Sequence, residues 1–248
     1  AMALASLAGG VGVTFAVVAL SSLILMAGLA RGDHGDRSVE FWMSLPTSHP
    51  ASFAVPLLVH LLLLPAVALA VGLVAGLLVS VPVITRTVGF GAWLALPWGD
   101  VLTAALAVTG RVLAGLPLAL LWLSPMMMAL VLLGAWVGRW AIVILGVGVG
   151  VGSGVLDRLL GQPWPALMLE RWFEGAGRSL AGASDLKHPA FHGAEISGPA
   201  DVLSLIPTLA AQDLGAAFAR LASPTLAFGL LIAAACFWGL VRWRRAGA

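Results

Sequence analysis

The chain has 248 residues, of which 60% are hydrophobic and only 10% are charged, and its formal net charge is +2 at pH 7. A soluble domain of this size could not bury so much apolar surface, and the mean hydropathy is +1.04. The small, scattered positive charge gives no reason to expect nucleic acid as a partner. The composition therefore predicts an all-α, polytopic protein that spans a lipid bilayer.

Charge-free windows of about 20 residues predict the membrane spans, since that length of helix crosses the hydrocarbon core. About five spans are expected in a single transmembrane domain covering 1–248. Their approximate ranges are 8–30, 53–83, 112–137, 140–157 and 223–242. Only a short turn containing Arg139 separates the third span from the fourth.

The positions of the basic residues predict the orientation, because short loops rich in Lys and Arg stay on the cytoplasmic side. If the N-terminus is external, several of these basic side chains and the C-terminal tail from Arg242 lie on the cytoplasmic side. The inner basic residues are then Arg31, Arg37, Arg139, Arg242, Arg244 and Arg245. We therefore expect a cytoplasmic C-terminus.

The stretch 87–110 is apolar but is interrupted by several glycines and by Pro97. A sixth span here would reverse every later helix and place the basic tail outside. Trp93 and Trp98 suit the headgroup boundary, where an indole ring can keep one edge in water. We therefore expect an interfacial or re-entrant segment, with Asp100 capping the helix that follows.

The stretch 158–222 has an ordinary soluble composition and is expected to form a small helical extracytoplasmic cap. Its second half carries one apolar stripe at helical spacing. The stripe consists of Leu203, Ile206, Ala210, Leu214, Ala217 and Leu221.

Two rows of glycine at four-residue spacing predict close helix packing, because small residues let helix backbones approach. One row is the pair Gly72 and Gly76 on the second span. The other is Gly146, Gly150 and Gly154 on the fourth span. Packing within the chain is the simpler interpretation, and packing between chains remains the alternative.

Residues for catalysis or metal binding are scarce, so we expect no enzyme activity, no cofactor and no metal. The sequence lacks a nucleotide-binding loop and the usual metalloprotease and serine hydrolase motifs. His60 is the one ionisable side chain inside its window, and a neutral, hydrogen-bonded histidine is the simpler interpretation. His188 and His192 have metal-like spacing, but Pro189 between them favours a solvated loop.

The most informative segment is 36–46, DRSVEFWMSLP, in the predicted cytoplasmic stretch 31–50. It combines charge, aromatic side chains and a terminating proline. Phe41 and Trp42 could form the apolar face of a short interfacial helix, with Arg37 and Glu40 exposed to the cytoplasm.

This segment resembles the coupling loop of bacterial ABC exporter permeases of the second type, which typically reads DRSxxFWxSLP. The residues WLSP from Trp122 and AWVGR ending at Arg139 are similar to the fourth and fifth spans of that family. In the family the loop meets a separate ATPase subunit. The resemblance implies that the coupling residues are Asp36, Arg37, Ser38, Glu40, Phe41, Trp42, Ser44, Leu45 and Pro46.

The resemblance implies an ATP-driven exporter in a bacterial cytoplasmic (inner) membrane. The chain would form the translocation path in a homodimer or heterodimer of permease subunits, and the ABC ATPase subunit would hydrolyse ATP. Because family members have six spans, the first span is expected to be missing here. The alternative function is a membrane scaffold or assembly protein that transports nothing.

Overall fold

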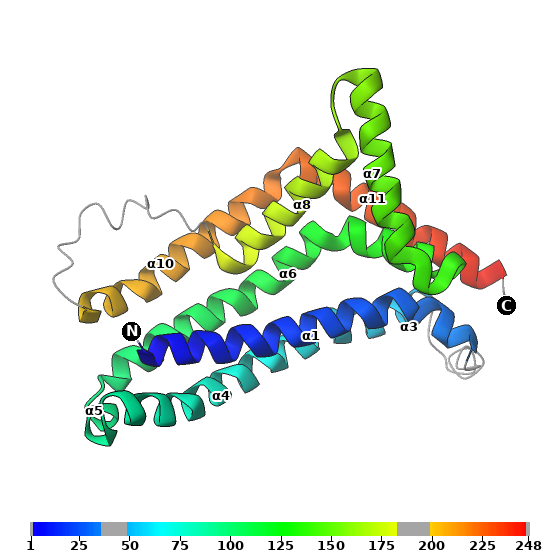
Figure 1. Ribbon diagram of the computed structural model, residues 1–248. Helices are drawn as coiled ribbons and strands as arrows, with labels where there is room; N and C mark the ends of the chain where they lie inside the picture. Colours follow the sequence, from blue (N-terminus) through cyan, green and yellow to red (C-terminus); the bar gives the residue numbers. More distant parts are fainter. Residues whose placement is uncertain (1, 36–48, 183–198, 247–248) are drawn as a thin grey trace. The chain divides into compact units, whose positions relative to one another are not determined.

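The computed structural model describes residues 2–35, 49–182 and 199–246, and the part it describes contains helices and no strand (Figure 1). The all-α prediction is therefore confirmed. In chain order the elements are α1 (Met2–Gly35), α3 (His49–Leu58), the π-helix η1 (Val59–Leu63), α4 (Leu64–Thr87), α5 (Phe90–Leu94), α6 (Trp98–Val137), the 3-10 helix η2 (Gly138–Trp140), α7 (Ala141–Leu160), α8 (Trp164–Ala181), α10 (Pro199–Ala219), the 3-10 helix η3 (Arg220–Ala222) and α11 (Pro224–Ala246).

Six helical stretches in the described residues are long and apolar enough to cross a membrane, which supports the polytopic prediction. They are Ala5–Ser22, Ala54–Thr87, Trp98–Val137, Ala141–Leu160, Asp201–Ala222 and Pro224–Trp243. Five of them overlap the five predicted spans. The additional one, Asp201–Ala222, lies in the stretch that the sequence assigned to an extracytoplasmic cap.

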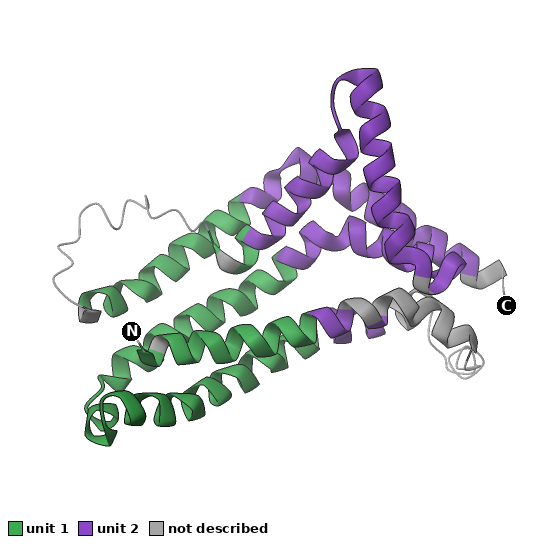
Figure 2. Cartoon of the chain, viewed as in Figure 1, with its two compact units in different colours: residues 1–19, 63–118, 178–219 green, residues 20–62, 119–177, 220–248 purple. Residues whose placement is uncertain are grey.

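The chain divides into two compact units, which Figure 2 colours separately. Unit 1 contains residues 1–19, 63–118 and 178–219, and unit 2 contains residues 20–62, 119–177 and 220–248. The long helices α1 and α6 each contribute residues to both units. Each unit has its own apolar core.

In unit 1, the first half of α1 packs against α4 through glycines. A Cβ atom added at Gly76 would lie 2.7 Å from the Cα atom of Leu7, and one added at Gly10 would lie 2.7 Å from the carbonyl oxygen of Gly72. The Thr14 hydroxyl donates to the carbonyl oxygen of Ala68 at 3.1 Å. Residues later in α1 contact residues earlier in α4, so the two helices run antiparallel. The glycines permit their close approach because they have no side chain.

The stretch 87–110 forms the turn between α4 and α6 and the first turns of α6. Gly89 has a φ of 100°, which only glycine adopts without strain, and α5 follows it. Trp93 Nε1 donates to the hydroxyl of the fully buried Ser80 at 3.1 Å, and Trp98 Nε1 donates to the Trp93 carbonyl at 2.9 Å. These indole bonds fix the short helix α5 against the end of α4.

The helix α6 is longer than the sequence indicated. It begins at Trp98 and contains 40 residues, whereas the predicted span begins at residue 112. At roughly 1.5 Å per residue it is about 60 Å long, twice the hydrocarbon thickness of about 30 Å. The helix is therefore tilted, or part of it extends beyond the bilayer.

The apolar core of unit 1 joins α1, α4, α6 and α10. Its buried members are Ala3, Leu7, Ile84, Val101, Ala104, Ala105 and Leu203. Leu203 and the adjoining Ile206 belong to the apolar stripe predicted for the cap. The beginning of that stripe therefore faces the core of unit 1.

In unit 2, α3, α6 and α11 share an apolar core. Its buried members are Leu57, Met127, Val131, Ala135 and Leu240. The helix α7 follows α6 after the short η2, where Gly138 has a φ of 60°. Buried Ala141, at the first turn of α7, packs with Leu130 of α6. The rest of α7 is mostly exposed, as expected for a helix that faces lipid.

Candidate functional site

The predicted coupling residues, Asp36 to Pro46, lie outside the described residues. In the described part, α1 ends at Gly35 and α3 begins at His49. The segment therefore connects two helices, each belonging to a long apolar stretch. The structure gives no contacts for its side chains.

The glycine rows differ in their surroundings. Gly72 and Gly76 lie against α1 in unit 1, as described above. A Cβ atom added at Gly146, Gly150 or Gly154 would have nothing within 4 Å. The described residues therefore supply a packing partner for the first row and leave the second row open.

His60 lies in the π-helical turn η1, between α3 and α4. Its Nδ1 atom is 2.9 Å from the carbonyl oxygen of Pro56 in the same helical run. Since a carbonyl can only accept, Nδ1 carries the proton. Pro65, which has no N–H group, follows this turn and cannot continue the regular pattern of backbone bonds. The ring is thus held by its own helix.

A buried ion pair joins α6 and α10 in unit 1. Arg111 Nη2 lies 2.8 Å from Asp213 Oδ2, and Arg111 Nε donates to the same oxygen at 2.8 Å. The side chains are 6% and 20% exposed, respectively. Both helices are among the six long apolar stretches. Arg111 was expected to lie before the third span and Asp213 in the cap, so the sequence did not predict their contact.

The C-terminal turn of α8 completes the bonding of this guanidinium. Arg111 Nη1 donates to the carbonyl oxygen of Ser179 at 2.6 Å, and Nη2 donates to that of Arg178 at 3.3 Å. The last carbonyl groups of a helix carry partial negative charge, and that of Arg178 also accepts from the Gly182 backbone N–H at 3.2 Å. A cation at this end of α8 is therefore stabilised by both the carboxylate and the helix terminus.

Two glycines allow these groups to come together. A Cβ atom at Gly115, one turn after Arg111, would overlap the Ser179 carbonyl oxygen. Gly182 ends α8 with a φ of 78°, and a Cβ atom there would overlap the Asp213 carboxylate. We call Arg111, Asp213 and the carbonyls of Arg178 and Ser179 the polar cluster.

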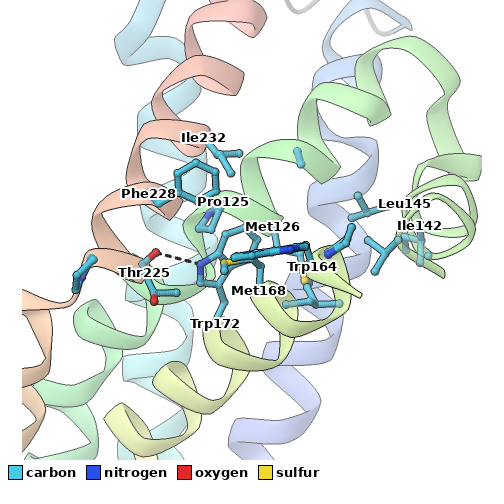
Figure 3. A pocket seen from close by; sticks show the side chains of 16 residues that line it. Pro125, Met126, Ile142, Leu145, Trp164, Met168, Trp172, Thr225, Phe228 and Ile232 are labelled. Atoms are coloured by element: carbon cyan, nitrogen blue, oxygen red, sulfur yellow. Dashed lines mark hydrogen bonds between the residues drawn. The ribbon is translucent and has the colours of Figure 1, made fainter. Parts of the chain in front are cut away.

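Unit 2 contains an apolar pocket of about 820 Å³ between α6, α7, α8 and α11 (Figure 3). Met126 from α6 and Met168 from α8 lie in its wall. Trp172 Nε1 donates to the backbone carbonyl of Thr225 at 3.4 Å, drawn as a dashed line in Figure 3. None of the described residues that line the pocket is charged. Its volume is within the range of about 300–1,000 Å³ that is common for small-molecule sites.

The helix α8 has two chemically different faces. Pro165, Met168, Leu169 and Trp172 line the pocket at helical spacing. The charged side chains of this helix are exposed instead. They are Glu170, Arg171, Glu174 and Arg178. The pocket was not predicted from the sequence, because no local pattern shows how the consecutive helices α6, α7 and α8 pack with one another and with the distant α11.

Comparison with protein-family models, with curated proteins and with solved structures gave no match. Among the described residues, no group of three or more His, Cys, Asp or Glu side chains could hold a metal ion. The features available for a functional interpretation are therefore the 36–46 motif, the polar cluster and the apolar pocket.

Proposed function

We propose that this protein is the transmembrane permease subunit of an ATP-driven exporter. A separate ABC ATPase subunit docks on residues 36–46 and hydrolyses ATP. The observation that carries the proposal is the DRSVEFWMSLP sequence, placed between α1 and α3. The motif that resembles a coupling loop thus connects the end of α1 to the start of α3.

In this mechanism, closure of two ATPase subunits moves the 36–46 segment and the helices joined to it. Phe41 and Trp42 supply the apolar anchor, while Arg37 and Glu40 supply polar contacts to the ATPase. The α1 helix is continuous from Met2 to Gly35. Its glycine contacts with α4 leave no room for sliding, since closely packed helices transmit displacement rather than absorb it. Tilting α1 therefore moves α4 as well and switches the pathway between its two open states.

The complex is a homodimer or heterodimer of permease subunits in a bacterial inner membrane, and transport is outward. These parts of the proposal rest on the resemblance of the motif. The apolar helices support the bilayer location.

Co-purification from native membranes in mild detergent tests the proposal. Mass spectrometry of the recovered complex is expected to identify a subunit with a nucleotide-binding loop. A variant with residues 36–46 scrambled, which still inserts, should lose that subunit. Recovery of the same ATPase with the scrambled variant would exclude the proposed docking site.

A non-transporting scaffold is the second candidate, and one observation favours it. Gly146, Gly150 and Gly154 form an open row on the exposed surface of α7, which suits a partner helix. Recovery of other membrane proteins alone, under conditions that preserve known ATPase complexes, would favour this function over transport.

A further inference from the structure

The chemistry of the pocket wall in unit 2 selects an uncharged, apolar ligand. Among the wall residues that the structure describes, only Thr225 has a hydroxyl group and none carries a charge. The indole N–H of Trp172 is already bonded to the Thr225 carbonyl. A sugar, nucleotide or ionic ligand would lose its hydration here without gaining partners, which is costly. A hydrocarbon chain has no hydrogen bonds to water that it would lose on entering the pocket.

The pocket opens onto an exposed apolar part of the surface of unit 2. Three residues of its wall are about half exposed: Ile142 at 51%, Trp164 at 47% and Phe228 at 53%. Ile142 and Phe228 belong to α7 and α11, two of the helices that are long and apolar enough to span the membrane. On α7 the neighbouring Val143 and Ile144 are exposed as well. A ligand can therefore enter from the bilayer.

The shape of the wall suits a flexible chain better than a rigid ring system. Met126 and Met168 project from two helices into the same space (Figure 3), and unbranched thioether side chains adapt to ligands of variable conformation. The same wall contains Gly146, at which a Cβ atom would meet nothing within 4 Å. This glycine keeps the α7 side of the pocket open.

We propose that this pocket binds an acyl chain of a membrane lipid, with the headgroup remaining outside. The chain enters between α7 and α11 and rests on the apolar face of α8. This proposal is independent of the proposed transport function, because it requires neither the ATPase nor the 36–46 segment. The lipid can be a resident of the bilayer or a transported amphiphile, and the bound chemistry is the same.

Photolabelling of the full chain in lipid nanodiscs tests the site. The probe is a phosphatidylcholine with a diazirine near the end of one acyl chain, and labelled peptides are mapped by mass spectrometry. Gly146→Phe fills the pocket. Gly148→Phe is the matched control, because Gly148 lies on the same helix in equally open space but outside the wall. Ala129→Leu narrows the pocket from α6 and serves if Gly146→Phe does not fold.

Specific binding predicts label on the pocket residues of α8 and α6, including Met168 and Met126. Gly146→Phe or Ala129→Leu should lower this label at least five-fold, and Gly148→Phe should leave it unchanged. Competition by unlabelled phosphatidylcholine identifies a bilayer lipid as the ligand, whereas competition by a single-chain amphiphile alone identifies a single-chain amphiphile. Equal labelling of all variants, label confined to outward α7 residues such as Val147, or crosslinks showing a second copy in the pocket would each overturn the proposal.

Discussion

Arg111 and Asp213 are 102 positions apart in the chain, yet two guanidinium nitrogens of Arg111 contact the same carboxylate oxygen at 2.8 Å. The pair joins α6 to α10, and the last turn of α8 supplies two more acceptors. Charged groups in apolar helices require such partners. Within unit 1, this cluster therefore joins α6, α10 and the last turn of α8 through polar contacts.

Removing one member of the ion pair should destabilise the protein strongly. Arg111→Leu removes the guanidinium that contacts the Asp213 carboxylate, and Asp213→Leu removes the carboxylate that contacts the buried Arg111 guanidinium. Each is expected to lower the free energy of unfolding by about 3–5 kcal/mol. The double variant should lose much less than the sum, since the interaction between the two side chains is lost only once. Unfolding in mixed detergent micelles, followed by circular dichroism, measures the three values. Strict additivity would mean that the two side chains do not interact.

The end of α8 offers a matched pair of glycines for testing the same cluster. Gly182 and Gly161 both have positive φ angles, 78° and 68°. Alanine at Gly161 meets nothing within 4 Å, so it should cost only backbone strain of roughly 1–2 kcal/mol. Alanine at Gly182 also overlaps the Asp213 carboxylate and should cost clearly more. Equal losses of unfolding free energy at the two positions would show that Asp213 does not lie against the α8 terminus.

Glycine packing between α1 and α4 gives a second matched pair. Gly76→Ala places a methyl group 2.7 Å from the Leu7 Cα atom, and overpacking of this kind costs about 1–3 kcal/mol. Gly150→Ala, in open space on α7, should be neutral or slightly stabilising because alanine favours helix. The measurement is again the free energy of unfolding. A greater loss at Gly150 than at Gly76 would contradict the described packing.

The apolar windows were readable from the sequence because charge and length alone identify a membrane helix. The stretch Asp201–Ala222 was harder to recognise, since it contains Asp201, Asp213 and Arg220 and its apolar 18-residue window has a mean hydropathy of only 1.4, compared with 2.7 for the window in Ala54–Thr87. Its second carboxylate is neutralised by Arg111, a contact that no local pattern reveals.

Two glycine rows with the same spacing in the sequence have different surroundings in the structure. Gly72 and Gly146 both begin rows at four-residue spacing. The first lies against Gly10 and Thr14 of α1, whereas the second has open space and lines the pocket. Which helix meets a glycine depends on the path of the whole chain. The four walls of the pocket could not be predicted for the same reason.

Replacing the aromatic residues of the proposed coupling segment should weaken binding of the ATPase subunit. Phe41→Ala and Trp42→Ala each remove an apolar anchor, and central aromatic residues of interfaces contribute about 2 kcal/mol or more. Loss of about 2 kcal/mol corresponds to a roughly thirty-fold weaker affinity. The double variant should therefore retain far less ATPase subunit in a pull-down. Phe90→Ala with Leu94→Ala, two exposed positions on α5 outside the motif, is the control and should retain it fully.

Site-specific photocrosslinking from position 42 tests the permease account most directly. The photoreactive residue p-benzoylphenylalanine replaces Trp42, and native membranes are irradiated before solubilisation. The account predicts a crosslink to a subunit that carries a nucleotide-binding loop, and none from the same residue placed at Phe90. A position 42 that crosslinks only to lipid or to other membrane proteins, in membranes where the ATPase is present, would contradict the account.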